Sequence, residues 1–144
     1  MANIVIVGLD GSEGSRRALD FAIRRAKAGQ HELMLVCVIP HSTHAILTID
    51  ELTRNEAWRQ AQRERVQREI LDPALSRTAE EGVRAHSRIE FGDPTEVLGE
   101  VAREIGASHV IVGRRGLSPL RALLFGSIAS RLVQTSPVPV TVVP

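Results

Sequence analysis

Several residue types are scarce or missing in this chain of 144 residues, and each shortage excludes a class of site. Cysteine occurs once, at Cys37, so an intramolecular disulfide and a cysteine metal cluster are both impossible. Tyrosine is absent and aromatic residues make up only 3%, which argues against a platform that stacks single-stranded nucleic acid. Lys27 is the only lysine and stands between two alanines, so the Gly-Lys-Ser/Thr of a Walker A loop is missing.

The chain also lacks an excess of charge and a long apolar stretch. Lys plus Arg total 18 and Asp plus Glu total 17, and a net charge of +1 argues against a protein dominated by contacts to nucleic-acid phosphates. No apolar run reaches the roughly 18 residues of a membrane span, and no basic-then-apolar leader opens the sequence. We therefore expect a cytoplasmic protein with neither a membrane nor a nucleic-acid partner. The length and the 43% of hydrophobic residues suit one globular domain over 1–144.

Short apolar runs alternate with segments of helical periodicity along the whole chain. Strands are predicted at 4–7, 33–39, 84–90, 109–113 and 138–143, the third of them less buried and near a sheet edge. Helices are predicted from Ser12 to a stop at Gly29, over 51–81 with a kink or break at Pro73, from Asp93 to Gly106, and over 127–135. This alternation predicts a three-layer α/β domain with a mainly parallel sheet.

Glycine-rich turns follow the first and the fourth of these strands. In open parallel sheets, ligands bind beyond the carboxyl ends of the strands, where the strand order reverses. If the two strands are neighbours, Gly113 and Gly116 let backbone approach a ligand closely, and a helix that begins at Gly126 and Ser127 favours an anion. Two arginines add positive charge to this loop, Arg114 and Arg115. The sequence thus predicts a phosphorylated ligand, and the alternative is a flexible loop whose glycines serve only turn geometry.

Two other phosphate-handling folds of the α/β class do not fit the residues. A two-component receiver domain needs an acidic pair after the first strand and a lysine late in the chain, whereas Asp10 stands alone and no lysine follows Lys27. A dinucleotide-binding turn needs the spacing G-x-G-x-x-G, and the glycines at 8, 11 and 14 do not have it.

The stretch GRRGLSPLRALLFGS, residues 113–127, carries a more specific pattern. Gly113 is followed after two residues by Gly116, and nine residues later come Gly126 and Ser127. In this pattern the chain resembles the ATP-binding branch of the universal stress protein family, whose signature it matches completely. The opening IVIVGLDGSEGSRRAL and the closing SPVPVTVVP resemble the family's first and last strands, so the resemblance runs from end to end.

The resemblance implies a five-stranded parallel sheet of order 3-2-1-4-5 with helices on both faces, an arrangement like that of the adenine nucleotide alpha hydrolases. It also implies an ATP site, with Mg²⁺ or Mn²⁺ accompanying the nucleotide. Asp10, next to Leu9, corresponds to an acid near the ribose or the phosphates, and Val38 corresponds to a position whose backbone reads adenine. The implied phosphate site comprises the four signature residues and two residues beside them: Gly113, Gly116, Gly126, Ser127, Arg115 and Ile128.

Rapid phosphoryl transfer needs charge on the transferred phosphate and a positioned base. No lysine lies near the loop and Asp10 is the only evident base, so we expect an ATP-binding stress-response regulator with slow or no hydrolysis. Two alternatives stay open: a weak ATPase or autophosphorylating enzyme, and a dimeric interaction module without functional nucleotide binding. Pro137 and Pro139 mark 138–143 as an edge strand. We expect a homodimer through this Val-rich strand, as in the family that the chain resembles, because the partner would cover it.

Overall fold

Five parallel strands form the centre of the protein, which a computed structural model describes over residues 3–40, 48–114 and 127–144. The strands are β1 (Ile4–Gly8), β2 (Glu32–Ile39), β3 (Ala85–Phe91), β4 (His109–Gly113) and β5 (Val140–Val143). Their order in space is β3-β2-β1-β4-β5, which confirms the expected 3-2-1-4-5 sheet. β1 and β4 are therefore neighbours, and the strand order reverses between them.

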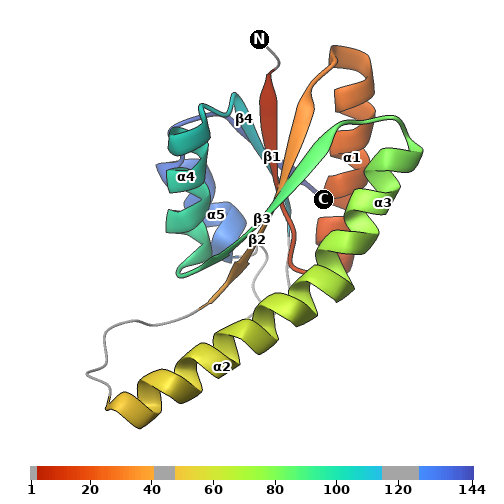
Figure 1. The fold of residues 1–144 in the computed structure, drawn as a ribbon. Coiled ribbons are helices and arrows are strands. Elements are labelled where there is room, and N and C mark those ends of the chain that lie inside the picture. Colours follow the sequence, from red (N-terminus) through yellow and green to blue (C-terminus); the bar gives the residue numbers. More distant parts are fainter. Residues whose placement is uncertain (1–2, 41–47, 115–126) are drawn as a thin grey trace.

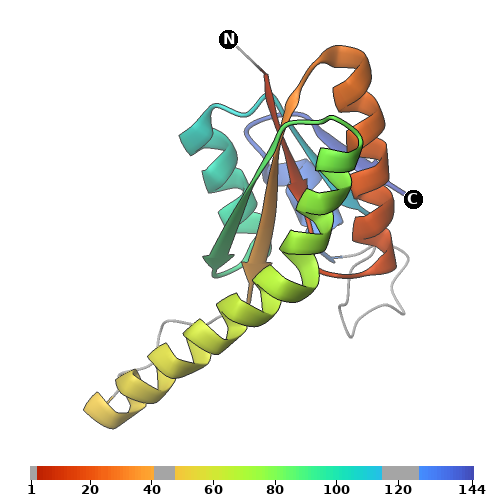
Figure 2. The same cartoon turned by 45° about the vertical axis from the view of Figure 1, so that its right-hand side comes forward.

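Helices cover both faces of this sheet (Figure 1). On one face lie α4 (Pro94–Ile105) and α5 (Ser127–Thr135), and on the other lie α1 (Glu13–Gly29) and α3 (Asp72–Glu80), an arrangement that the turned view repeats (Figure 2). Successive strand residues point to opposite faces, so Ile6 joins the core beneath α4 and α5 while Val7 joins the core beneath α1. Two covered faces explain why the central strands read as unbroken apolar runs.

The two ends of α1 differ in how well the sequence predicted them. Ser12 caps the start as expected, because its hydroxyl accepts a hydrogen bond from the Ser15 N–H at 3.1 Å. The predicted stop at Gly29 is wrong by one residue: Gly29 is still helical, and Gln30 takes the left-handed conformation with φ 56°. A Cβ at Gly29 would lie 2.6 Å from Nε2 of His31, so the His31 ring would have to turn away from it.

The helix predicted over 51–81 forms as three consecutive segments, α2 (Ile49–Val66), the π-helical turn η1 (Gln67–Leu71) and α3. It begins earlier than predicted because Thr48 and Glu51 form a reciprocal capping box. The expected disturbance at Pro73 takes the form of a widened turn, since proline has no N–H and crowds the carbonyl four residues earlier. The Asp72 N–H instead donates to the carbonyl of Gln67, five residues back. The first part of α2 extends beyond the sheet (Figure 2).

The sheet ends in two edge strands, β3 and β5. The placement of β3 confirms the prediction of a less buried edge strand over 84–90. β5 begins two residues later than the predicted 138–143, because Pro139 has no N–H to donate and the Val138 N–H bonds to the Ser136 hydroxyl at 3.2 Å. Across the described segments, none of the helices has both the length and the apolar character that a membrane crossing requires.

Candidate functional site

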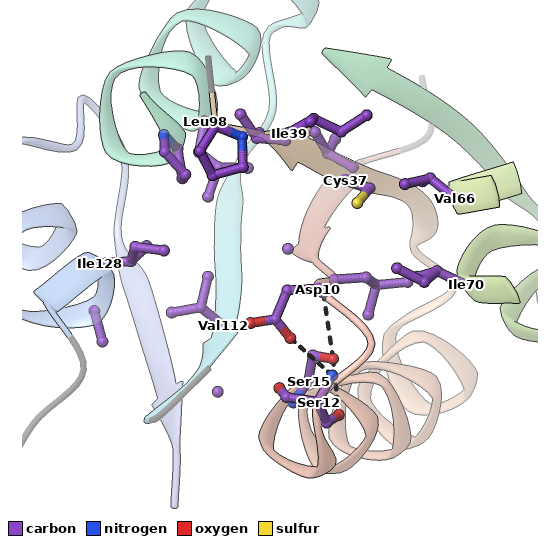
Figure 3. A pocket seen from close by; sticks show the side chains of 18 of the residues that line it. Asp10, Ser12, Ser15, Cys37, Ile39, Val66, Ile70, Leu98, Val112 and Ile128 are labelled. Atoms are coloured by element: carbon purple, nitrogen blue, oxygen red, sulfur yellow. Dashed lines mark hydrogen bonds between the residues drawn. The ribbon is translucent and has the colours of Figure 1, made fainter. Parts of the chain in front are cut away.

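A cleft of about 480 Å³ opens at the carboxyl ends of β1, β2 and β4. This volume lies in the range of roughly 300–1,000 Å³ that is usual for small-molecule sites. Figure 3 shows Val112 and Ile128 on one side of the cleft, Val66 and Ile70 on the other, and Asp10 between them. The cleft lies where the sequence placed a crevice, because β1 and β4 are neighbours and both glycine turns begin at this edge.

Five of the nine residues that the sequence pointed to line this cleft: Leu9, Asp10, Val38, Gly113 and Ile128. Ser127 is the first residue of α5, directly before Ile128. Arg115, Gly116 and Gly126 fall outside the described residues. The part of the predicted site that the structure describes is therefore gathered in one place, although its residues come from the turn after β1, from β2, from β4 and from α5.

Asp10 is held at the start of α1 by a small network of backbone and hydroxyl groups. Its Oδ1 accepts a hydrogen bond from the Ser12 N–H at 2.9 Å, and its own N–H donates to Oγ of Ser15 at 3.4 Å (Figure 3). The Ser15 hydroxyl donates in turn to the Ser12 carbonyl at 3.0 Å. This Asx-type turn orients the carboxylate in the cleft. A carboxylate in this position can accept hydrogen bonds from a ligand's hydroxyl groups.

Val38 lies two residues beyond Val36, the last residue of β2 that pairs with β1. The Leu9 N–H donates to the Val36 carbonyl at 2.9 Å, and β1 pairs with β2 only as far as Gly8 opposite Val36. Backbone groups alternate sides along a strand, so the N–H and C=O of Val38 point the same way as those of Val36. They therefore face the cleft beyond the end of β1, where one donor and one acceptor can pair with the edge of a planar base.

Gly113 is required by packing as well as by any ligand. A Cβ at this position would lie 2.5 Å from the carbonyl oxygen of Gly14 and 2.6 Å from its carbonyl carbon. The end of β4 and the first turn of α1 thus approach each other as closely as bare backbone allows. The sequence interpretation linked this glycine to the ligand alone and missed the contact with α1.

The cleft has features that favour an anion. α1 and α4 begin where β1 and β3 end, and Ile128 in the first turn of α5 lines the cleft, so the positive ends of three helix dipoles face this edge. Three arginines and two aspartates also line it: Arg65, Arg114, Arg131, Asp10 and Asp93. Nη2 of Arg131 lies 3.0 Å from Oδ2 of Asp93, which joins α5 to the start of α4.

Sequence reasoning missed this ion pair. It interpreted Asp93 as the N-cap of α4, and the structure does place it there, but its side chain makes no capping hydrogen bond. Nothing in the local sequence connects Asp93 with Arg131, because the two residues are 38 positions apart. Their pairing depends on how α4 and α5 pack together on the same face of the sheet.

Cys37 forms part of the cleft wall and is chemically inert there. Only 3% of its surface is exposed. The pKa of its thiol is raised to about 11, chiefly by burial and also by the charge of Asp10, while Arg65 opposes the shift. The thiol is therefore protonated at neutral pH and is a poor nucleophile. This confirms its interpretation as a small buried hydrophobic residue.

Comparisons with known proteins agree with this fold. A sequence model described as the universal stress protein family matches residues 1–144. Universal stress protein YxiE of Bacillus subtilis (strain 168) is 35% identical over 156 aligned positions that cover 99% of each chain. Universal stress protein UspA from Lactobacillus plantarum superposes with a TM-score of 0.83 at 18% identity, over 99% of this chain and 97% of that one. A universal stress protein solved in complex with cAMP superposes with a TM-score of 0.70 at 28% identity, again over 99% and 97%.

Proposed function

This chain belongs to the universal stress protein family, and we propose that it binds ATP in the cleft beside β1 and β4 and acts as a cytoplasmic stress-response regulator. The observation that carries the proposal is the gathering of Leu9, Asp10, Val38, Gly113 and Ile128 around one cleft at the start of α5. The relative in complex with cAMP supports an adenine nucleotide as the ligand. The complete glycine signature over 113–127 supports a triphosphate in particular.

In this proposal the base lies between the apolar walls and pairs with the backbone of Val38. The ribose hydroxyls reach the Asp10 carboxylate, and the phosphates extend past Gly113 to the N-terminus of α5. Within the described residues, no cluster of three or more His, Cys, Asp or Glu side chains could hold a metal ion. Mg²⁺ is commonly bound by one or two carboxylates together with the substrate phosphates. The phosphates themselves would hold Mg²⁺ or Mn²⁺, and the ion would neutralise phosphate charge.

The direct test is to purify the protein without added nucleotide, denature it and identify what it releases by chromatography. Adenine nucleotide in near-stoichiometric amount is expected. If the protein releases none, and added ATP with Mg²⁺ does not raise its melting temperature, the ATP proposal is wrong. A dimer under those conditions would favour the alternative of an interaction module without nucleotide.

We expect ATP hydrolysis with Mg²⁺ to be far slower than the ~10 s⁻¹ median of enzymes. The reason is that the described cleft holds arginines but no lysine, and both of its aspartates are engaged: Asp10 accepts from the Ser12 N–H and Asp93 pairs with Arg131. Steady-state phosphate release by the wild type measures the rate. A rate near the median that Asp10→Asn abolishes, while the exposed-site control Glu13→Gln keeps it, would favour the weak ATPase instead.

Arg131 is expected to contribute to phosphate binding. Arg131→Gln should weaken ATP about tenfold, the loss of one charge-assisted hydrogen bond, and should leave adenosine binding nearly unchanged. Arg103→Gln, on the exposed surface of α4, is the matched control. Calorimetric titrations with ATP and with adenosine separate the two ligands. Equal weakening of both by Arg131→Gln would mean that the residue only supports the fold through Asp93.

We further propose that two copies pair through β5, which is a sheet edge in the single chain. The Val110 N–H donates to the Pro139 carbonyl at 3.0 Å, so the odd-numbered residues of β5 bond to β4. By alternation, the N–H and C=O groups of Val140 and Val142 face outward. An unpaired edge of this kind is a template for another strand, and a two-fold partner would cover it.

Val142→Pro is expected to convert the dimer to a monomer. Proline removes an outward-facing N–H without costing a β4–β5 hydrogen bond, and its preference for extended neighbours suits a strand. Sedimentation at micromolar concentration measures the mass, and Val142→Thr, which keeps the N–H, is the control. A charged side chain would test the interface less cleanly, because Val140 and Val142 also pack against the core beneath α4 and α5. A monomeric wild type, or a proline variant that still dimerises, would contradict the proposal.

A further inference from the structure

The described part of the cleft offers a nucleotide base no aromatic ring to stack on. None of the residues that line it there is Phe, Trp or Tyr, and its apolar walls are aliphatic. The flat faces of bases are usually bound by planar groups, either aromatic rings or the guanidinium planes of arginines. Three arginines do line this part of the cleft: Arg65, Arg114 and Arg131. Among the described residues, these arginines are therefore the candidates for stacking on a base.

The three arginines lie at different parts of the cleft. Arg114 directly follows β4 and Arg131 lies in α5, the two elements that flank the glycine signature and the proposed phosphates. Arg65 comes instead from the last turn of α2, directly before Val66. Figure 3 shows Val66 across the cleft from Ile128 of α5. Arg65 therefore borders the cleft on the wall opposite the proposed phosphate site.

The guanidinium of Arg65 lies near the end of β2, where the proposed base pairs. Burial and the charge of Asp10 raise the pKa of the Cys37 thiol, whereas the positive charge of Arg65 lowers it, so the guanidinium is close enough to act on that side chain. Cys37 directly precedes Val38, whose backbone is proposed to pair with the edge of the base. Arg65 is therefore the arginine placed beside the base.

Contacts within α2 and η1 hold the guanidinium plane of Arg65. Its Nε and Nη2 donate to Oε1 of Gln62 at 3.3 Å and 3.0 Å, and its Nη1 lies 3.6 Å from Oε2 of Glu69. The N–H groups of a guanidinium lie in its plane, so these partners occupy its edges and leave its two faces for stacking. About half of the side chain is exposed, so a base can reach a face without breaking any of these contacts.

We propose that the guanidinium of Arg65 stacks on the face of the bound base and makes the cleft favour purines over pyrimidines. This inference rests on the proposed nucleotide site and adds a residue to its base-binding half. A cation over an aromatic face is attracted by the negative charge of the π-system, and the larger purine ring offers more surface to the stacked plane. The backbone of Val38 reads the edge of the base, whereas Arg65 selects its size.

The first experiment compares adenosine with ATP in calorimetric titrations. Arg65→Gln should weaken both about three- to tenfold, because stacking acts on the base alone. Arg65→Lys keeps the positive charge but not the planar group, so it should restore only part of the loss. Arg68→Gln is the matched control, because Arg68 also pairs with Glu69 but does not line the cleft. Weakening of ATP alone by Arg65→Gln would show that the residue acts on the phosphates, and the proposal would be wrong.

Two further readouts separate stacking from a structural role. With saturating adenosine, the ring current of the base should move the NMR signals of the Arg65 Cδ protons, while those of Arg68 stay in place. The preference of the wild type for adenosine over cytidine should fall in Arg65→Gln. An Arg65 signal that does not move, or equal effects of the Arg65 and Arg68 variants on binding, would overturn the stacking proposal alone. A wild type that binds neither adenosine nor ATP would overturn the nucleotide site itself, and the role of Arg65 with it.

Discussion

Gly126→Val is expected to abolish ATP binding while the ligand-free melting temperature stays close to that of the wild type. Gly126 closes the signature that begins at Gly113 and directly precedes Ser127, the first residue of α5. It falls outside the described residues, so the argument rests on this position in the sequence. A β-branched side chain adds bulk and stiffens the backbone where the proposed phosphates must meet the N–H groups of a helix N-terminus.

The size of the expected loss follows from linkage between ligand binding and folding. At a hundredfold excess of ATP over its dissociation constant, the wild type should gain about 2.7 kcal/mol of stability, and Gly126→Val should gain none. Thermal unfolding with and without ATP measures both. Ser127→Ala is the graded control: it removes one hydroxyl but keeps the backbone N–H groups, so it should lose only part of the gain. A full ATP-dependent shift in Gly126→Val would show that the phosphates bind elsewhere.

Gly113→Ala is expected to destabilise the ligand-free protein by about 1–3 kcal/mol or more, the range of overpacked sites. The added Cβ would lie 2.5 Å from the carbonyl oxygen of Gly14, and both partners are backbone, so neither can rotate away. The end of β4 or the start of α1 must therefore move. Chemical denaturation of the wild type and the variant gives the difference in unfolding free energy.

Gly99→Ala is the matched control, a glycine to alanine change within α4. There the added Cβ would lie 3.6 Å from Cδ of Pro137, an ordinary contact. Because glycine in a helix interior costs about 0.5–1 kcal/mol relative to alanine, this variant should be slightly more stable than the wild type. If Gly113→Ala were as stable as Gly99→Ala, the close approach of β4 to α1 would be wrong, and the glycine would serve the ligand alone.

The order of elements followed closely from local patterns, and the departures have local causes too. Turn residues and periodicity located all five predicted strands and the start of α1 at Ser12. The predicted stop at Gly29 was wrong by one residue, because Gln30 rather than Gly29 adopts the left-handed conformation that ends α1. Pro139 shortened β5, and Pro73 produced a π-helical turn in the long helix rather than a break.

In the candidate site, some residues could be predicted from the sequence and others could not. The site residues at the carboxyl ends of strands one, two and four could be found from the glycine turns and the family resemblance, since parallel strands present these ends at one edge. The pairing of Asp93 with Arg131 could not be found in this way. Neither could the position of Cys37 in the cleft wall, because a side chain in a buried strand reads the same whether it faces a core or a ligand.

By itself, the sequence determined the α/β class and the alternation of strands and helices, because periodicity, caps and turn residues act over a few neighbouring positions. With the family signature, it also indicated the 3-2-1-4-5 order and that the turns after the first and fourth strands meet at one cleft. Only the tertiary structure decided that Gly113 meets Gly14, and that Asp93 pairs with Arg131. Such contacts join segments far apart in the chain, and they depend on how helices and strands pack rather than on what any one segment prefers.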